Sequence, residues 1–213
     1  MEVIWHGHSC FEFRGDGPTV VLDPHDGKSL GIKPPVCSAD IVLMTHGHSD
    51  HSASRVVRGN HEDVLGRNGA FEVKGLTATG YPSFHDEEEG AERGLNTIYK
   101  FEMEGIVVCH CGDLGDIPSQ DVVDALEDVD ILFVPVGETY TIKLDKLDRF
   151  IKMVDPKIIV PMHYRVGGLT LPIFTIDEFL KYVDDDSVIY VGNEVDITLD
   201  DVSEFMGCWI FDR

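Results

Sequence analysis

The sequence has few basic residues: 17 lysines and arginines stand against 39 aspartates and glutamates, giving a formal net charge of −22. Most of such a surface repels nucleic acid, so DNA or RNA is not expected as a partner. Apolar runs are short, and none reaches the ~20 residues needed to span a bilayer. A membrane partner is therefore not expected either.

A disulfide framework is also missing, because the five cysteines are odd in number and irregularly spaced. The first residues lack the basic start and apolar core of a secretion signal. We therefore expect a reducing, cytoplasmic location. Apolar residues make up 43% of the 213 positions, enough for one domain over residues 1–213 with a sizeable core. A homo-oligomer is left open.

Short β-branched runs, each closed by a polar turn, predict buried strands. They cover residues 19–22, 41–44, 106–109, 131–134 and 157–160. Helical spacing predicts helices over 119–127, 144–154 and 175–183, with Ser119 and Thr175 as expected N-caps. The acidic run Asp86–Glu89 favours a solvated surface.

Polar residues that can bind metal follow four of the predicted strands directly. They are Asp23, His46 with His48, Asp113 and His163. Loops at strand ends, carried by a rigid sheet, are where functional sites are commonly built. The four strands therefore predict one shared cleft.

The strongest local motif is His46-Gly47-His48-Ser49-Asp50-His51, which places four ligand types within six positions. Neutral imidazole suits zinc, and aspartate adds a harder oxygen ligand. In an extended loop His46 and His48 point the same way and can hold one ion, while Asp50 and His51 turn towards a second. The small Gly47 and Ser49 let the loop fold tightly.

This H-x-H-x-D-H motif resembles the signature of the metallo-β-lactamase superfamily, and in particular its small metal-dependent hydrolases of the ascorbate-6-phosphate lactonase-like branch. The resemblance implies an α/β fold, a four-layer αββα sandwich, with two divalent ions, zinc before Mn²⁺ or Fe²⁺. It implies a supporting role for Asp23 behind the metal loop. The first implied site is His46, His48, His85 and Asp113, and the second is Asp50, His51, Asp113 and His163.

Four further residues have open roles. His8 resembles a position near the metals and is predicted as catalytic together with Asp50 and Asp113, although a core histidine bonded to backbone fits as well. His110 is expected to orient a ligand from behind. Glu138 stands where the branch has a glycine. Arg93 suits either an anionic substrate or a pairing with the acidic run.

The implied reaction is hydrolysis of a small ester, lactone, amide or phosphoester by a hydroxide that bridges the two metals. A phosphodiesterase or nuclease could use the same ligands, although the acidic charge disfavours long nucleic acids. Di-iron redox chemistry is disfavoured because His48 stands where that branch has glutamate. A non-catalytic metal-binding module is the alternative from another class.

Overall fold

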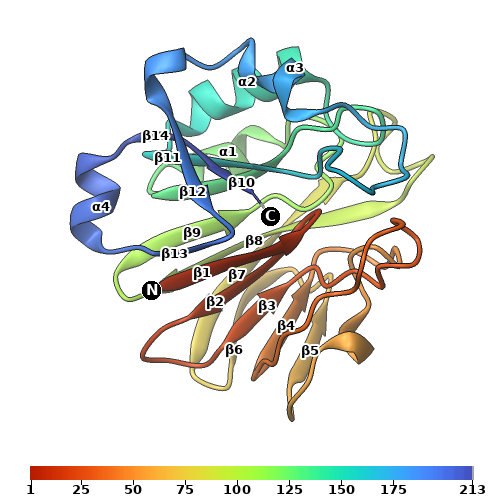
Figure 1. The fold of residues 1–213 in the computed structure, drawn as a ribbon, viewed down its shortest axis with the longest axis vertical. Helices are drawn as coiled ribbons and strands as arrows, with labels where there is room; N and C mark the ends of the chain where they lie inside the picture. The colour runs from red at the N-terminus through yellow and green to blue at the C-terminus, as the bar shows by residue number, and fades with distance from the viewer. Residues whose placement is uncertain (213) are drawn as a thin grey trace.

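Two β-sheets pack face to face in the computed structural model, which describes residues 1–212 (Figure 1). The first sheet has six strands in the order β13-β1-β2-β3-β4-β5. Its strands pair antiparallel except for β3 with β4 and β4 with β5, which are parallel. The strands span β1 Glu2–Gly7, β2 Cys10–Arg14, β3 Val20–Leu22, β4 Ile41–Met44, β5 Glu62–Leu65 and β13 Glu194–Asp196.

The second sheet has eight strands in the order β12-β14-β11-β10-β9-β8-β7-β6. From β9 to β12 the neighbouring strands are parallel, and from β6 to β9 they are antiparallel. The strands span β6 Gly69–Val73, β7 Leu76–Phe84, β8 Leu95–Met103, β9 Ile106–His110, β10 Ile131–Pro135, β11 Ile158–Met162, β12 Val188–Gly192 and β14 Gly207–Phe211.

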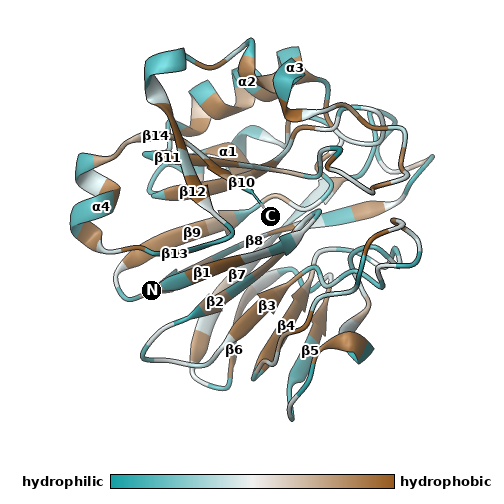
Figure 2. Ribbon diagram, viewed as in Figure 1, coloured by the Kyte–Doolittle hydropathy of each residue, from teal (hydrophilic) through white to brown (hydrophobic). Residues whose placement is uncertain are grey.

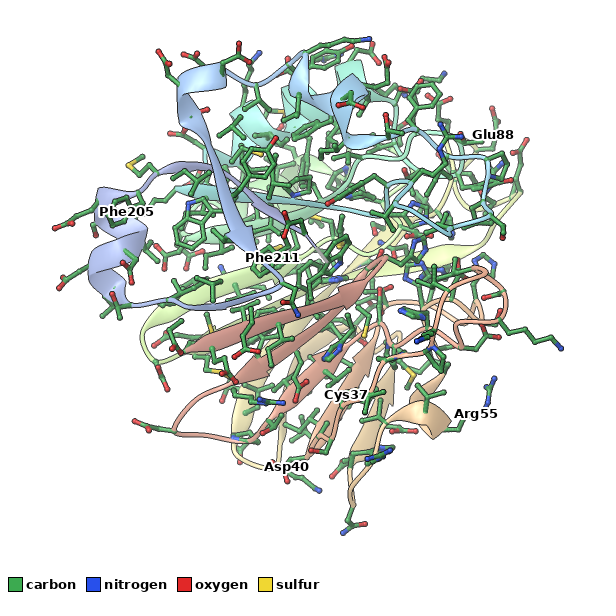
Figure 3. All side chains as sticks on the ribbon, in the orientation of Figure 1. Cys37, Asp40, Arg55, Glu88, Phe205 and Phe211 are labelled. Carbon is green, nitrogen blue, oxygen red and sulfur yellow. The ribbon has the colours of Figure 1, made fainter. Side chains whose placement is uncertain are left out.

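α1, α2 and α3 connect strands of the eight-stranded sheet and lie on its outer side, whereas α4 connects β13 of the first sheet to β14 of the second (Figure 1). α2 shows why its sequence is helical, since Leu144, Leu147, Phe150, Ile151 and Val154 form one buried stripe. On the outer face of the six-stranded sheet, irregular chain and one 3-10 turn replace helices, and Figure 3 labels Cys37 and Arg55 on this side. The helical segments are α1 Gln120–Asp124, α2 Leu144–Val154, α3 Ile176–Leu180, α4 Leu199–Glu204, η1 Ser54–Val56 and η2 Asp185–Ser187.

The main hydrophobic core fills the space between the two sheets and continues beneath the helices that cover the eight-stranded sheet, and Figure 2 shows apolar colouring on both strands and helices. Phe11 and Phe13 of β2 contact Phe133 of β10 across this interface, with ring centroids 4.6 and 5.5 Å apart. A smaller core beneath the irregular chain includes Cys10, Cys37 and Val42. The α/β sandwich of the predicted class is thus confirmed.

The five predicted strands all form, but two predicted helices are shorter than expected. α1 ends at Asp124 and α3 ends at Leu180. Ser119 and Thr175 occupy the N-cap positions as predicted, although neither side chain accepts a bond from the helix backbone. Thr175 instead donates to the carboxylate of Asp177. All five cysteines are free and buried, and none of the described helices is long and apolar enough to cross a membrane.

Candidate metal centre

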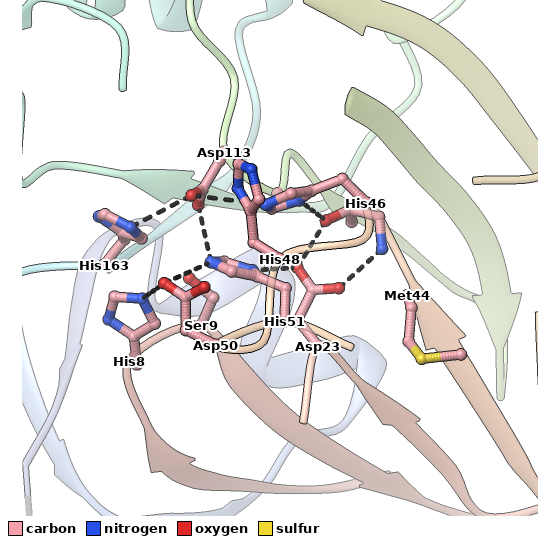
Figure 4. A network of polar contacts seen from close by, with 12 residues as sticks. His8, Ser9, Asp23, Met44, His46, His48, Asp50, His51, Asp113 and His163 are labelled. Carbon is pink, nitrogen blue, oxygen red and sulfur yellow. Dashed lines mark hydrogen bonds and ion pairs between the residues drawn. The ribbon is translucent and has the colours of Figure 1, made fainter. Parts of the chain in front are cut away.

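The polar residues that follow the strands meet at one edge of the sandwich. β3 and β4 run parallel, so Asp23 and His46 emerge side by side, and the amide of Asp23 donates to the carbonyl of Leu43 at 3.0 Å. β9, β10 and β11 are also parallel, which brings Asp113 and His163 to the same edge from the other sheet. The predicted shared site therefore lies between the carboxyl ends of strands from both sheets (Figure 4).

Three imidazoles form the first group. One ring nitrogen from each of His46, His48 and His85 lies within 4.8 Å of the others. His46 and His85 are buried, whereas His48 is exposed at the mouth of the site. His85 comes from the end of β7 in the opposite sheet, where its amide donates to the carbonyl of Gly94 at 3.0 Å. These three rings can hold one ion, and they are the three histidines of the first site that the sequence implied.

The second group joins His8 to Asp50, His51 and His163, again with one ligand atom of each within 4.8 Å. His8 Nε2 lies 3.4 Å from Asp50 Oδ2, and His51 Nε2 lies 3.8 Å from the same oxygen. His8 is fully buried in the tight turn between β1 and β2. The structure thus brings His8 into direct proximity with the second predicted metal site.

Asp113 lies between the two groups. Its Oδ2 lies 3.2 Å from His85 Nε2 and 3.3 Å from His163 Nε2, and its Oδ1 lies 3.2 Å from His51 Nε2. Ligands of one tetrahedral zinc, bound at 2.0–2.1 Å, are separated by roughly 3.3 Å. The donor atoms around Asp113 therefore have the spacing that a shared ion requires.

Several of these buried atoms have no hydrogen-bond partner among residues 1–212. They include both ring nitrogens of His8, Nε2 of His46 and His51, and Oδ1 of Asp113. Buried polar atoms without a partner cost free energy, so native proteins rarely leave many of them together. A cation ligated by these atoms would satisfy them, and the nitrogen and carboxylate donors suit zinc. The residues therefore fit the divalent ions that the resemblance implies.

Burial keeps two of the rings neutral. Burial, together with the nearby ring of His163, lowers the pKa of His8 to about 3. Burial and the charge of His51 likewise lower the pKa of His46 to about 3. Neutral imidazole carries the lone pair that a metal ligand needs. Both rings are therefore able to bind metal at neutral pH without first losing a proton.

Carboxylates dominate the centre of the site. Burial alone would lower the pKa of His51, but Asp113, Asp50 and Asp23 raise it well above its usual range. Burial alone would raise the pKa of Asp113, but the rings of His163 and His51 hold it well below its usual range. The position between these groups thus favours positive charge strongly, as a cation site should.

Asp23 supports the metal loop from behind, as the sequence implied. Its buried carboxylate accepts from the Thr45 amide at 2.8 Å and the Thr45 hydroxyl at 2.7 Å, and it lies 2.8 Å from His51 Nδ1. This contact directs Nε2 of His51 towards Asp113. His110 is further away, since its Nδ1 is 4.0 Å from Asp23 and its Nε2 lies 3.0 Å from the Ser9 carbonyl oxygen.

Four residues at the site have left-handed backbone conformations although they are not glycine: His8, Asp23, Glu138 and His163, with φ between 43° and 59°. Such conformations are strained for side-chain-bearing residues and persist where surrounding structure enforces them. They turn the chain sharply at the ends of β1, β3, β10 and β11. No sequence pattern gave this feature.

Asn96 and Asp86 also support the centre, and the sequence predicted this role for neither. Asn96 accepts from the Asp113 amide at 3.1 Å and donates to the Cys111 carbonyl at 2.8 Å. Asp86, predicted as part of a solvated run, is buried and accepts four backbone bonds from residues 88–93. An aspartate ahead of a glycine-containing loop is a signal that could have indicated this role.

A cavity of about 180 Å³ opens onto the metal centre. Arg93, Tyr140 and Leu171 lie on its walls beside the predicted ligands. A neighbouring cavity of about 260 Å³ shares His85, Arg93 and Tyr140 with it and includes Glu138. A separate group of ligand types, His6, Glu12 and Cys37, has no residue in common with the centre.

Comparison with known proteins agrees with this architecture. A family profile described as the beta-lactamase superfamily domain matches residues 2–163. A metal-dependent hydrolase of Thermoplasma acidophilum is 28% identical over 192 residues, covering 79% of this chain and 85% of that protein. A metal-dependent hydrolase of Archaeoglobus fulgidus is 26% identical over 198 residues, with the same coverage of 79% and 85%.

A solved structure from Thermotoga maritima, assigned to the metallo-β-lactamase superfamily as a proposed Zn-dependent hydrolase, is also similar. It superposes with a TM-score of 0.81 at 33% identity and covers 99% of this chain and 97% of that one. Similarity of this extent includes both sheets and the edge at which their strands end.

Proposed function

We propose, from the premise that this chain belongs to the metallo-β-lactamase superfamily, that it is a hydrolase with two divalent ions in its active site. Its relatives are named metal-dependent hydrolases, which supports the general class. The observation that carries the proposal is the position of Asp113, whose carboxylate faces His85 and His163 through one oxygen and His51 through the other.

In this proposal His46, His48 and His85 hold the first ion, and Asp50, His51 and His163 hold the second with His8 beside them. Asp113 would be a ligand of both. Such ions, when bound, lower the pKa of water towards 7 and polarise a carbonyl or phosphoryl oxygen. Zinc fits the donors best, and Mn²⁺ or Fe²⁺ are the alternatives.

The residues of the chain supply position and charge. Asp50 and Asp113 place ionised carboxylates where a reacting water can donate a hydrogen bond and be aimed at the substrate. The buried ring of His8 places its Nε2 3.4 Å from Asp50 Oδ2, at the edge of the same site. The small cavity suits a small ester, lactone, amide or phosphoester better than a polymer.

The narrower resemblance to ascorbate-6-phosphate lactonase-like proteins stays a prediction, as do a cytoplasmic location and a homo-oligomer. The five free cysteines are compatible with a reducing compartment. A screen of lactones, esters, amides and phosphodiesters with zinc-loaded protein, after elemental analysis, would establish the reaction.

The direct test is His48→Ala. His48 is exposed, so its removal should leave the fold intact while weakening the first metal site. Loss of an outer-shell partner lowers metal affinity or activity about 10–100-fold, so loss of a direct ligand should cost at least roughly 100-fold. Metal content and turnover should fall together, with unchanged circular dichroism.

His61→Ala is the matched control, because His61 pairs with Asp63 outside the centre and should retain both metal and activity. Full turnover by a His48→Ala protein that still contains its metal would refute the assignment of this ligand.

A further inference from the structure

The cavity at the metal centre has one guanidinium on its wall and no ammonium group among the described residues. That guanidinium belongs to Arg93, which lines both the 180 Å³ cavity and the neighbouring 260 Å³ cavity. In a chain with a net charge of −22, an arginine at this position is the exception to its surroundings.

The loop that carries Arg93 is fixed by a buried carboxylate. Asp86 follows the predicted ligand His85 and accepts bonds from the amides of Glu88, Gly90, Glu92 and Arg93 at 2.7–3.0 Å. The backbone of Gly115 packs directly against the backbone of Asp86, since an added Cβ on Gly115 would lie 2.1 Å from the Asp86 amide nitrogen. Figure 3 labels Glu88 of this loop at the periphery of the molecule. The position of the Arg93 backbone is thus set before any ligand binds.

Contacts with two side chains also fix the orientation of the Arg93 guanidinium. It lies over the ring of Tyr140, with Cζ 5.7 Å from the ring centroid. One nitrogen, Nη1, donates to Glu92 at 3.2 Å, an exposed carboxylate on the wall of the neighbouring 260 Å³ cavity. A guanidinium has five N–H donors, so this single contact leaves donors that can face the cavity. Arginine held in advance of binding loses less entropy when it contacts a ligand.

The neighbouring cations are already neutralised. Lys143, on the wall of the second cavity, pairs with Glu87 at 2.7 Å. Lys146 pairs with Glu87 and with Asp116, both at 2.8 Å. Arg93 also pairs with Glu92, but through Nη1 alone, and neither lysine lies on the wall of the 180 Å³ cavity. Arg93 is therefore the cation that a ligand in this cavity would meet.

We propose that Arg93 binds one carboxylate group of the substrate, so that the substrate is a small molecule with a single carboxylate beside its hydrolysable bond. This inference rests on the proposed hydrolase function and narrows its substrate class. A planar carboxylate matches the two parallel N–H groups of a guanidinium.

A phosphate group fits this opening less well. It carries a charge of about −1.5 to −2 at pH 7 and is commonly bound by several backbone amides or several cations. Here the amides of Glu88, Gly90, Glu92 and Arg93 are already taken by Asp86. The carboxylates of Glu138 and Glu92 on the same wall add repulsion that grows with the charge of the ligand.

The test compares two methyl esters of similar length, monomethyl succinate and methyl butyrate, with zinc-loaded protein. The wild type should have a higher kcat/KM for the succinate ester, and Arg93→Met should lower the ratio of the two values by tenfold or more, mainly through KM. Arg67→Met is the matched control, because Arg67 stacks on Phe71 and does not line either cavity. An unchanged ratio in Arg93→Met would overturn the proposal.

Two further measurements separate the alternatives. Calorimetric binding of succinate to the zinc-loaded protein should weaken tenfold or more in Arg93→Met, and equal affinity would overturn the proposal even if neither ester is cleaved. Inorganic phosphate should inhibit more weakly than succinate. Stronger inhibition by phosphate that is lost in Arg93→Met would overturn the proposal and show that Arg93 binds a phosphate group instead. Metal-loaded protein that hydrolyses no compound of the wider screen would count against the proposed function itself.

Discussion

Some residues at the centre make several contacts at once that depend on their particular side chain. Asp23 is the clearest case, because its fully buried carboxylate contacts two donors of Thr45 and the ring of His51. Its backbone, at φ 43°, is itself strained. A charged acceptor in such a position fixes which ring nitrogen of His51 faces the metal.

We therefore expect Asp23→Asn to weaken metal binding about 10–100-fold and to destabilise the fold by about 2 kcal/mol, since charged hydrogen bonds are lost. Metal titration and urea unfolding measure the two effects. Asp63→Asn is the control, because Asp63 contacts His61 at 2.7 Å at the surface. Metal affinity that is equal in Asp23→Asn and the wild type would show that Asp23 has no orienting role.

Some residues of the site can be identified from the sequence more readily than others. The H-x-H-x-D-H motif is local, so His46, His48, Asp50 and His51 could be recognised from spacing alone. His163 was indicated by its place after a predicted strand, whereas His85 needed the family resemblance, because a lone histidine carries little information. Asp86 looked like surface charge, and its burial depends on Gly115, which is 29 positions away and leaves room for the loop.

Whole elements were predicted where the pattern is continuous. The buried runs of β3, β4, β9, β10 and β11 were found because each is apolar and ends in a polar turn. The C-terminal ends of α1 and α3 were not, because the chain continues there in tighter turns, in which the amide of Leu126 donates to the carbonyl of Val123 and that of Tyr182 to the carbonyl of Phe179. The pairing of β13 with β1 joins positions almost 200 residues apart, and no local pattern encodes such a contact.

The β1–β2 hairpin contains a buried glutamate that should make stability depend on pH. Burial by itself would raise the pKa of Glu12, but hydrogen bonds and charges of His6 and Arg14 lower it below its usual range. His6 lies 2.7 Å and Arg14 2.9 Å from its carboxylate. A carboxyl with a lowered folded-state pKa stabilises the fold fully above its unfolded-state pKa of about 4.3. This stabilisation is lost as the pH falls through the folded-state value.

Glu12→Gln should therefore lower the free energy of unfolding at pH 7 by about 1–3 kcal/mol, and the difference from wild type should shrink below pH 4. Urea unfolding at several pH values measures this. Glu72→Gln, at an exposed position of β6, is the control and should change little. A difference that stays constant from pH 7 to pH 3 would exclude the ionised carboxylate as its cause.

At the scale of the molecule, the metal centre joins the two sheets. β4 and the β1–β2 turn supply His46, His48, Asp50, His51 and His8 from the six-stranded sheet, and the eight-stranded sheet supplies His85, Asp113 and His163. The fold class was predictable because the motif and strand pattern agree. The facing of the two sheets was not, since it depends on packing such as that of Phe11 against Phe133.

Ions that bridge the sheets should stabilise the whole fold, because they bind the folded chain and not the separated strands. At a free zinc concentration 1,000 times the dissociation constant, binding adds about 4 kcal/mol, which corresponds to a rise in Tm of roughly 8–16 °C for a chain of this size. Removal of zinc by a chelator should reverse it. Cys37→Ser should keep the full rise, because Cys37 belongs to the group outside the centre, and His48→Ala should lose part of it. Equal Tm values for the wild type with and without bound zinc would mean that the two sheets are not linked through metal.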